Sequence, residues 1–160
     1  MSSRVSPVRI MAVVGLLALA ACETMDDSLG NAFEDSWEAE GYTFYAWLRG
    51  AGEPSGGDLD GAGVALIRFA DTGDQICARF QTEKLATITA AHIHRGSSQA
   101  IGAPLVMLDL PDGDWLDDCV AAERGLLDEI RDNPAGFHVN VHTAEFPDGA
   151  VRGQIAPLVD

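Results

Sequence analysis

Lysine is almost absent from this chain of 160 residues: Lys84 is the only one, and ten basic residues stand against 25 acidic ones. The formal net charge is −15 at pH 7. A surface with this charge repels nucleic acid and anionic lipid headgroups, so we expect no nucleic-acid partner. The charge is compatible with cations or basic partners, and it also serves simply to keep a protein soluble.

Long apolar runs are also lacking. The run at residues 10–21 has 12 residues, too few to span a bilayer comfortably, and it follows the basic residues Arg4 and Arg9. It ends in Leu19-Ala20-Ala21-Cys22, which resembles a bacterial lipobox. We therefore expect residues 1–21 to be a signal peptide and Cys22 to carry the lipid. The alternative is an ordinary secretory signal with an incidental Cys22.

Lipid attachment would make this a membrane-anchored lipoprotein, periplasmic or on the cell surface, and not a transmembrane protein. The mature chain would keep 139 residues with a net charge of −17, enough for one domain with its own core. Residues 22–41 are acidic and carry no strand pattern, so we expect a tether with a short helix around 32–39. The globular domain is expected at residues 42–158.

Signatures of catalysis are missing. The chain has no phosphate-cradling glycine loop and no dinucleotide fingerprint. Ser97 and Ser98 lie in no G-x-S-x-G context, and the acidic residues are scattered through loops. We therefore expect a non-catalytic protein with no catalytic residues.

What the chain does contain is a polar hairpin near its end. Residues 137–143 and 150–155 alternate around the turn Pro147-Asp148-Gly149. Each strand carries apolar residues on one face and polar residues on the other. On the polar face lie His138, Asn140, His142, Arg152 and Gln154. This pattern indicates either a functional surface or a buried hydrogen-bonded network.

A second polar strand, residues 91–96 (AHIHRG), places His92 and His94 on one face. This motif, together with NVHT and VRGQI in the terminal hairpin, resembles the CHRD domain, the module named after chordin. The resemblance covers about residues 42–158 and implies an extracytoplasmic all-β domain without a settled activity. His138 stands where the family usually has an aromatic residue, so no role is transferred to it.

The rest of the chain reads as short strands between Gly- and Asp-rich turns. The class that this predicts is an all-β Greek-key sandwich or barrel of about seven or eight antiparallel strands. One short helix is expected at 121–132, ended by Asn133-Pro134, after a turn-rich connection at 111–118. Asp58-Leu59-Asp60-Gly61 resembles a calcium loop but lacks its downstream Glu, so we expect a turn there.

Two cysteines remain if Cys22 is lipidated. Even parity in an oxidising compartment favours a disulfide between Cys77 and Cys119, and the family resemblance points the same way. The alternative is two separate buried thiols.

Two interpretations of the polar face stay open. It is either a hydrogen-bonded structural or recognition network, in which Arg152 would prefer a carboxylate such as Glu145, or a metal site. The network would contain His92, His94, Asn140, His142, Arg152 and Gln154. The metal site would use His92, His94 and His142, whose imidazoles suit copper or zinc, with a faint likeness to superoxide dismutase. We expect a binding or scaffold module for an unknown protein or small-molecule ligand, with no cofactor, and keep copper or zinc binding as the alternative.

Overall fold

The structure, a computed structural model, describes residues 41–108 and 116–158. The predicted signal peptide, Cys22 and nearly all of the acidic tether lie outside these residues. The strands are β1 (Phe44–Arg49), β2 (Ala62–Phe69), β3 (Gln75–Glu83), β4 (Ile88–Arg95), β5 (Pro104–Leu108), β6 (Leu116–Ala121), β7 (Phe137–Thr143) and β8 (Val151–Pro157). The helices are α2 (Arg124–Asp132) and the 3₁₀ turns η2 (Gly50–Gly52) and η3 (Pro134–Gly136).

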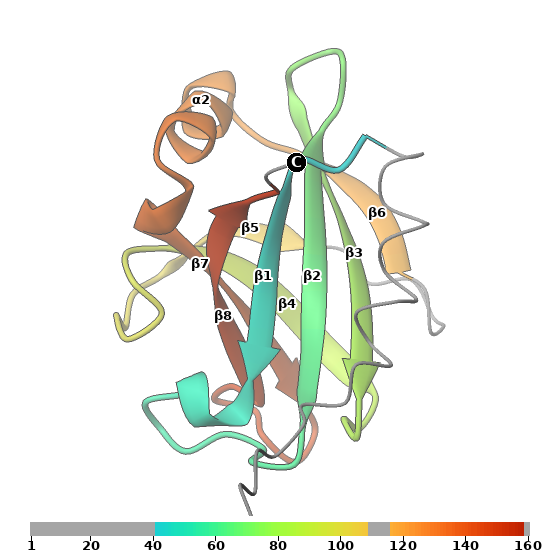
Figure 1. Cartoon of the computed structure of the whole chain (residues 1–160), viewed down its shortest axis with the longest axis vertical. Coiled ribbons are helices and arrows are strands. Elements are labelled where there is room, and N and C mark those ends of the chain that lie inside the picture. Colours follow the sequence, from blue (N-terminus) through green and yellow to red (C-terminus); the bar gives the residue numbers. More distant parts are fainter. Residues whose placement is uncertain (1–40, 109–115, 159–160) are drawn as a thin grey trace, which may run out of the picture.

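All eight strands belong to one antiparallel sheet in the order β5-β4-β7-β8-β1-β2-β3-β6. The two outermost strands, β5 and β6, contact each other, so the sheet curls into a nearly closed barrel (Figure 1). The predicted class, an all-β barrel of antiparallel strands with one short helix, is confirmed.

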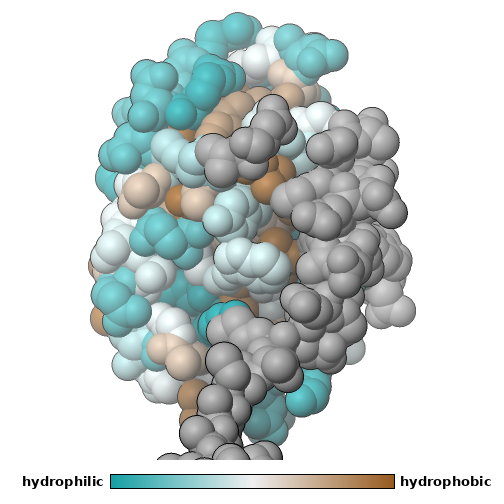
Figure 2. Space-filling model, in the orientation of Figure 1, coloured by the Kyte–Doolittle hydropathy of each residue, from teal (hydrophilic) through white to brown (hydrophobic). Residues whose placement is uncertain are grey.

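Alternation along the strands fills the barrel. In β1, Phe44, Ala46 and Leu48 are buried in the core, whereas Trp47 points outward and is half exposed. The same alternation brings the inward residues of every neighbouring strand into one apolar cluster, which includes Ile67, Ile93 and Val139. The described outer surface on the side of β1 and β2 is mostly hydrophilic or neutral, with small hydrophobic patches between (Figure 2).

The helix α2 packs on one end of the barrel (Figure 1). Leu127 and Ile130, three residues apart on one helix face, are buried in the core cluster. An exposed ion pair of 2.6 Å between Arg95 and Glu129 connects the end of β4 to this helix. The helix begins three residues later than predicted, because the chain before it belongs to a strand.

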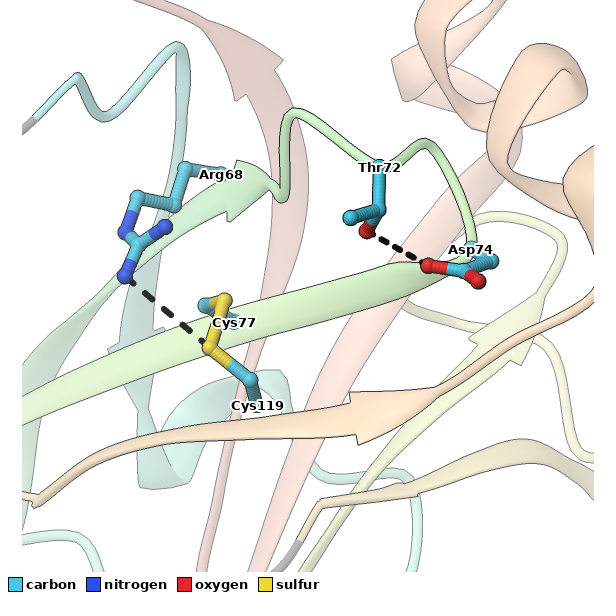
Figure 3. Close-up of a disulfide and its surroundings, with 5 residues drawn as sticks. All are labelled: Arg68, Thr72, Asp74, Cys77 and Cys119. Atoms are coloured by element: carbon cyan, nitrogen blue, oxygen red, sulfur yellow. Dashed lines mark hydrogen bonds between the residues drawn. A yellow bond between two sulfur atoms is a disulfide. The ribbon is translucent and has the colours of Figure 1, made fainter.

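That strand, β6, corrects the prediction of a turn-rich connection leading into a helix at residue 121. Residues 116–121 pair with β3, with Cys77 opposite Cys119 in the register. The predicted disulfide joins these two cysteines and is confirmed (Figure 3). Arg68 points its guanidinium at Cys119 Sγ, at 3.9 Å (Figure 3). Residues 111–115 lie outside the described part of the chain.

The Asp58–Gly61 segment is a turn, as predicted. Asp58 Oδ1 accepts hydrogen bonds of 3.1 Å from the backbone N–H groups of Asp60 and Gly61. A carboxylate used in this way stabilises an Asx turn.

Among residues 41–108 and 116–158, no helix combines the length and the apolar character needed to cross a membrane.

Candidate functional site

The candidate site lies on the outer face of three adjacent strands, β4, β7 and β8, opposite the core. We call its seven residues the polar cluster: His92, His94, His138, Asn140, His142, Arg152 and Gln154. Strand register arranges six of them in two rows that run across the sheet. The first row is His94–His138–Gln154, and the second is His92–Asn140–Arg152. The structure therefore brings together the six residues of the predicted network, and His138, which alternation places on the same face, lies among them.

Residues on an outer barrel face are normally solvated, but most of this cluster is buried. His138 is fully buried, Asn140 is 2% exposed, and His94 and Arg152 are each 7% exposed. The cover comes from two loops, residues 96–103 after β4 and residues 50–61 after β1. The Nε2 amide of Gln99 connects the two loops by donating to the carbonyl oxygen of Gly52.

Side chains of the polar cluster hold the loop at 96–103 in place. Arg152 Nη1 donates to the carbonyl oxygens of Ser98, at 3.2 Å, and Ala100, at 2.8 Å. Gln154 accepts a 2.8 Å bond from the backbone N–H of Ser98 on the same loop. The Nε2 amide of Gln154 also donates to the carbonyl oxygens of Ala135 and Phe137 before and at the start of β7. Arg152 and Gln154 are therefore positioning residues for this loop.

The carboxylate that pairs with Arg152 is Glu53, not the predicted Glu145. Arg152 Nε donates to Glu53 Oε1 at 3.0 Å, and both side chains are almost fully buried. Glu145 is exposed in the turn between β7 and β8. Proximity in sequence suggested Glu145, but the loop after β1 folds across the first residues of β8 and delivers Glu53. Burial raises the pKa of Glu53, and the charge of Arg152 opposes that rise.

Two glycines allow close approaches at the site, one between β8 and β1 and one between the terminal hairpin and Glu53. A Cβ at Gly153 would lie 2.0 Å from the carbonyl oxygen of Trp47, so only glycine lets β8 pack this tightly on β1. A Cβ at Gly149 would lie 2.6 Å from the Glu53 carboxylate, and its φ of +134° also favours glycine. The glycines of the terminal hairpin therefore serve the site as well as the turn.

The four histidines share one tautomer. A carbonyl oxygen can only accept a hydrogen bond, so a ring nitrogen facing one must carry the proton. Nδ1 of His94 faces the carbonyl oxygen of Gly102 at 2.9 Å, and Nδ1 of His138 faces that of Gly96 at 3.1 Å. Nδ1 of His142 faces the carbonyl oxygen of Pro147 at 2.9 Å. In neutral rings, each of these histidines therefore presents a bare lone pair at Nε2.

The tautomer of His92 follows from that of His142. Nε2 of His142 lies 3.2 Å from Nδ1 of His92, and the bare lone pair of His142 requires His92 to donate. His92 is therefore protonated at Nδ1 as well, and its Nε2 carries a lone pair. His142 uses its own Nε2 in this bond, so it orients His92 and presents no lone pair of its own.

The acceptor atoms that this arrangement leaves bare are buried and have no hydrogen-bond partner within the described residues. The atoms concerned are Nε2 of His92, His94 and His138, together with Oδ1 of Asn140 and Oε2 of Glu53. Every one of them is a hydrogen-bond acceptor. A buried polar atom without a partner costs about 1–3 kcal/mol, so such a concentration of acceptors is unusual in a folded protein.

Burial favours the neutral form of the His92, His94 and His138 rings. It lowers the pKa of His92 to about 4, with smaller contributions from His142 and His94. Burial also lowers the pKa of His94 and His138, partly opposed by their bonds to Gly102 and Gly96, and the charge of Arg152 lowers both further. Neutral imidazole is the form that binds a metal ion or accepts a proton.

The histidine rings lie close together but do not surround one point. His94 and His138 are stacked with centroids 5.1 Å apart, and the centroids of His92 and His94 are 5.7 Å apart. In the part of the chain that the structure describes, no three His, Cys, Asp or Glu side chains already form a metal-holding group. His138 was missed as a site residue because the family pattern assigned it no role. Its place in the polar alternation of residues 137–143 was the signal that it belongs here.

Comparisons with known proteins identify the domain but not a ligand. No curated protein and no solved structure matches the chain. The family model described as the CHRD domain matches residues 44–155, which run from the first residue of β1 into β8 and include the whole polar cluster. The chain belongs to the CHRD domain family.

Proposed function

We propose that this protein is a non-catalytic binding module that a lipid on Cys22 displays outside the cytoplasm. The supporting observation for binding is the group of buried acceptor atoms in the polar cluster. Acceptors without hydrogens are complemented by a ligand that carries positive charge or several hydrogen-bond donors. The ligand class is therefore a cation or a donor-rich small molecule.

The disulfide and the lipobox support an extracytoplasmic protein. The Cys77–Cys119 disulfide is typical of oxidising compartments, and the lipobox at residues 19–22 precedes an acidic segment suited to a tether. The disulfide also consumes both cysteines of the domain, so neither can act as a nucleophile. Backbone carbonyls fix the tautomer of His94, His138 and His142, and His142 fixes that of His92, so the acceptor atoms are held in place for a ligand.

Binding is tested by melting the full-length protein, purified in detergent without a polyhistidine tag, with a panel of probes. The panel contains ammonium, guanidinium, a short diamine and divalent metal ions. We expect at least one probe to raise the melting temperature, because a ligand of the folded state stabilises it by mass action. His138→Phe should lose this response, whereas the exposed Asp60→Asn should keep it. A panel without effect, or an equal effect in His138→Phe, would refute the proposal.

Display at the membrane is tested separately. Wild-type protein should enter the detergent phase in phase partitioning, and Cys22→Ser should stay in the aqueous phase or remain unprocessed. Wild-type protein found entirely in the aqueous phase would contradict lipid attachment.

A further inference from the structure

We propose that the acidic segment before the barrel docks as an amphipathic helix on the outer face of β1, β2 and β3, and so holds the barrel close to its lipid anchor. The surface for this helix is the outer cluster, which consists of Tyr42, Val64 and Leu66. The occupant is the segment of residues 32–40, with Phe33 and Trp37 as its apolar side chains. This docking does not depend on a ligand of the polar cluster.

The outer cluster is buried although it lies outside the barrel. Val64 and Leu66 point away from the core, because their neighbours Ala65 and Ile67 in β2 belong to the core cluster. Each is nevertheless only 3% exposed, and Tyr42 is buried with them. None of the described helices lies over β1 and β2 in Figure 1. Burial of this apolar cluster therefore requires cover from another part of the chain.

Two arginines border the outer cluster. The register places Arg79 opposite Leu66, and Arg68 follows Leu66 by two residues on the same face of β2. Both guanidinium groups approach the ring of Tyr42, with the central carbon 5.8 Å from the centroid for Arg68 and 5.5 Å for Arg79. An apolar surface bordered by cations is complementary to an amphipathic helix that carries acidic residues beside its apolar ones.

Residues 32–40 have this complementary pattern. Phe33 and Trp37 are four residues apart, so a helix places them on one face, and it places Glu34 and Glu38 together on the adjacent face. The whole stretch of residues 22–40 contains seven acidic residues and no basic one. Gly41, with a φ of +73°, has the left-handed conformation that commonly follows the last residue of a helix.

The dimensions of the helix and the surface agree. Nine helical residues are about 13 Å long, and three neighbouring strands span about 10 Å. The segment joins the barrel at Tyr42, which is part of the surface, so a turn at Gly41 brings the helix directly over it. Docking reduces the free tether to residues 22–31, which reach at most about 35 Å when fully extended. A lipid on Cys22, as proposed above, then keeps the barrel near the membrane.

Hydrogen–deuterium exchange of the full-length protein in detergent, followed by mass spectrometry, tests the docking. The amides of residues 33–40 should exchange at least about tenfold more slowly than those of an unstructured chain, because burial of an aromatic side chain stabilises a contact by an order of magnitude or more. Leu66→Asp and, separately, Phe33→Ser/Trp37→Ser should remove this protection. Met107→Asp is the matched control and should keep it, because it places the same carboxylate on the outer face of β5, where the side chain is already 60% exposed.

The amides of β7 in the same samples report whether each variant is folded. If Leu66→Asp unfolds the barrel, Phe33→Ser/Trp37→Ser decides alone, because it changes no residue of the barrel. The inference is overturned if residues 33–40 of wild type exchange like an unstructured chain, if a folded docking variant keeps the protection, or if Met107→Asp loses it. Protection that is independent of protein concentration supports docking within one chain, whereas protection that falls on dilution would place the segment on a second copy and overturn the inference.

Discussion

Replacing Arg152 by methionine should destabilise the domain strongly, because it removes one partner of a buried ion pair. Methionine keeps most of the volume but leaves the Glu53 carboxylate without its 3.0 Å hydrogen bond, in a position where its side chain is fully buried. Breaking a buried pair from one side costs about 3–5 kcal/mol. For a domain of this size, that corresponds to a fall in melting temperature of roughly 10–20 °C.

The pH dependence of this loss identifies its cause. Burial already raises the pKa of Glu53 above its ordinary value, and removing Arg152 removes the charge that opposes the rise. An acid whose folded-state pKa is raised stabilises the folded state at low pH, and this stability is lost as the pH rises above its unfolded-state pKa. The difference in unfolding free energy between wild type and Arg152→Met should therefore shrink as the pH falls from 7 towards about 4.5, the region where the unfolded carboxyl titrates.

Urea unfolding at a series of pH values measures both effects. Arg131→Met is the matched control, since Arg131 pairs with Asp128 on the exposed surface of α2, and it should cost less than about 1 kcal/mol. The double variant Glu53→Gln/Arg152→Met should recover part of the lost stability, because it removes the buried charge. Arg152→Met that costs no more than Arg131→Met, or whose cost is independent of pH, would refute the reasoning.

Two further predictions concern the disulfide and the histidines. Cys77→Ser and Cys119→Ser should each destabilise the domain by roughly 3–4 kcal/mol, because the bridge closes a loop with a sequence separation of 42, and peptide mapping without reductant should recover the two cysteines linked. A native protein with both thiols open to alkylation would rule the bridge out. Burial lowers the pKa of His92 from 6.5 to about 4, so wild type should lose stability relative to His92→Gln as the pH falls from 6.5 to 4, measured by urea unfolding. A constant difference over this interval would show that His92 titrates normally.

Local alternation was enough to predict most of the barrel. It assigned the buried face of β1 through Phe44, Ala46 and Leu48 and the polar face of β7 through Asn140 and His142, because both depend only on a period of two residues. The strand β6 was missed since its pairing with β3 is a long-range contact. The Asp-rich sequence around this strand carries no local signal for that pairing, in which Cys119 lies opposite Cys77.

The sequence predicted which residues form the site but not which hydrogen-bond partners they have. Alternation placed His92, His94 and His142 on one face. Which ring nitrogen of each histidine carries the proton depends on carbonyl oxygens of loops that reach the rings only in the folded chain. Glu53 was not predicted as the partner of Arg152, because the two residues are 99 positions apart and meet through the folding of a glycine-rich loop. The exclusion of His138 rested on a family pattern, whereas the strand period alone included it.

The central claim is that three histidines of the polar cluster, His92, His94 and His138, each present a lone pair at Nε2. Long-range ¹H–¹⁵N NMR of uniformly labelled protein at neutral pH reports which nitrogen of each imidazole carries the proton. The geometry predicts a proton on Nδ1 of all four rings, with signals of unprotonated nitrogen at Nε2 of His92, His94 and His138. A proton on Nε2 of His92, His94 or His138 would contradict the claim, because that ring would then offer the cluster a donor and could not bind a cation through that nitrogen.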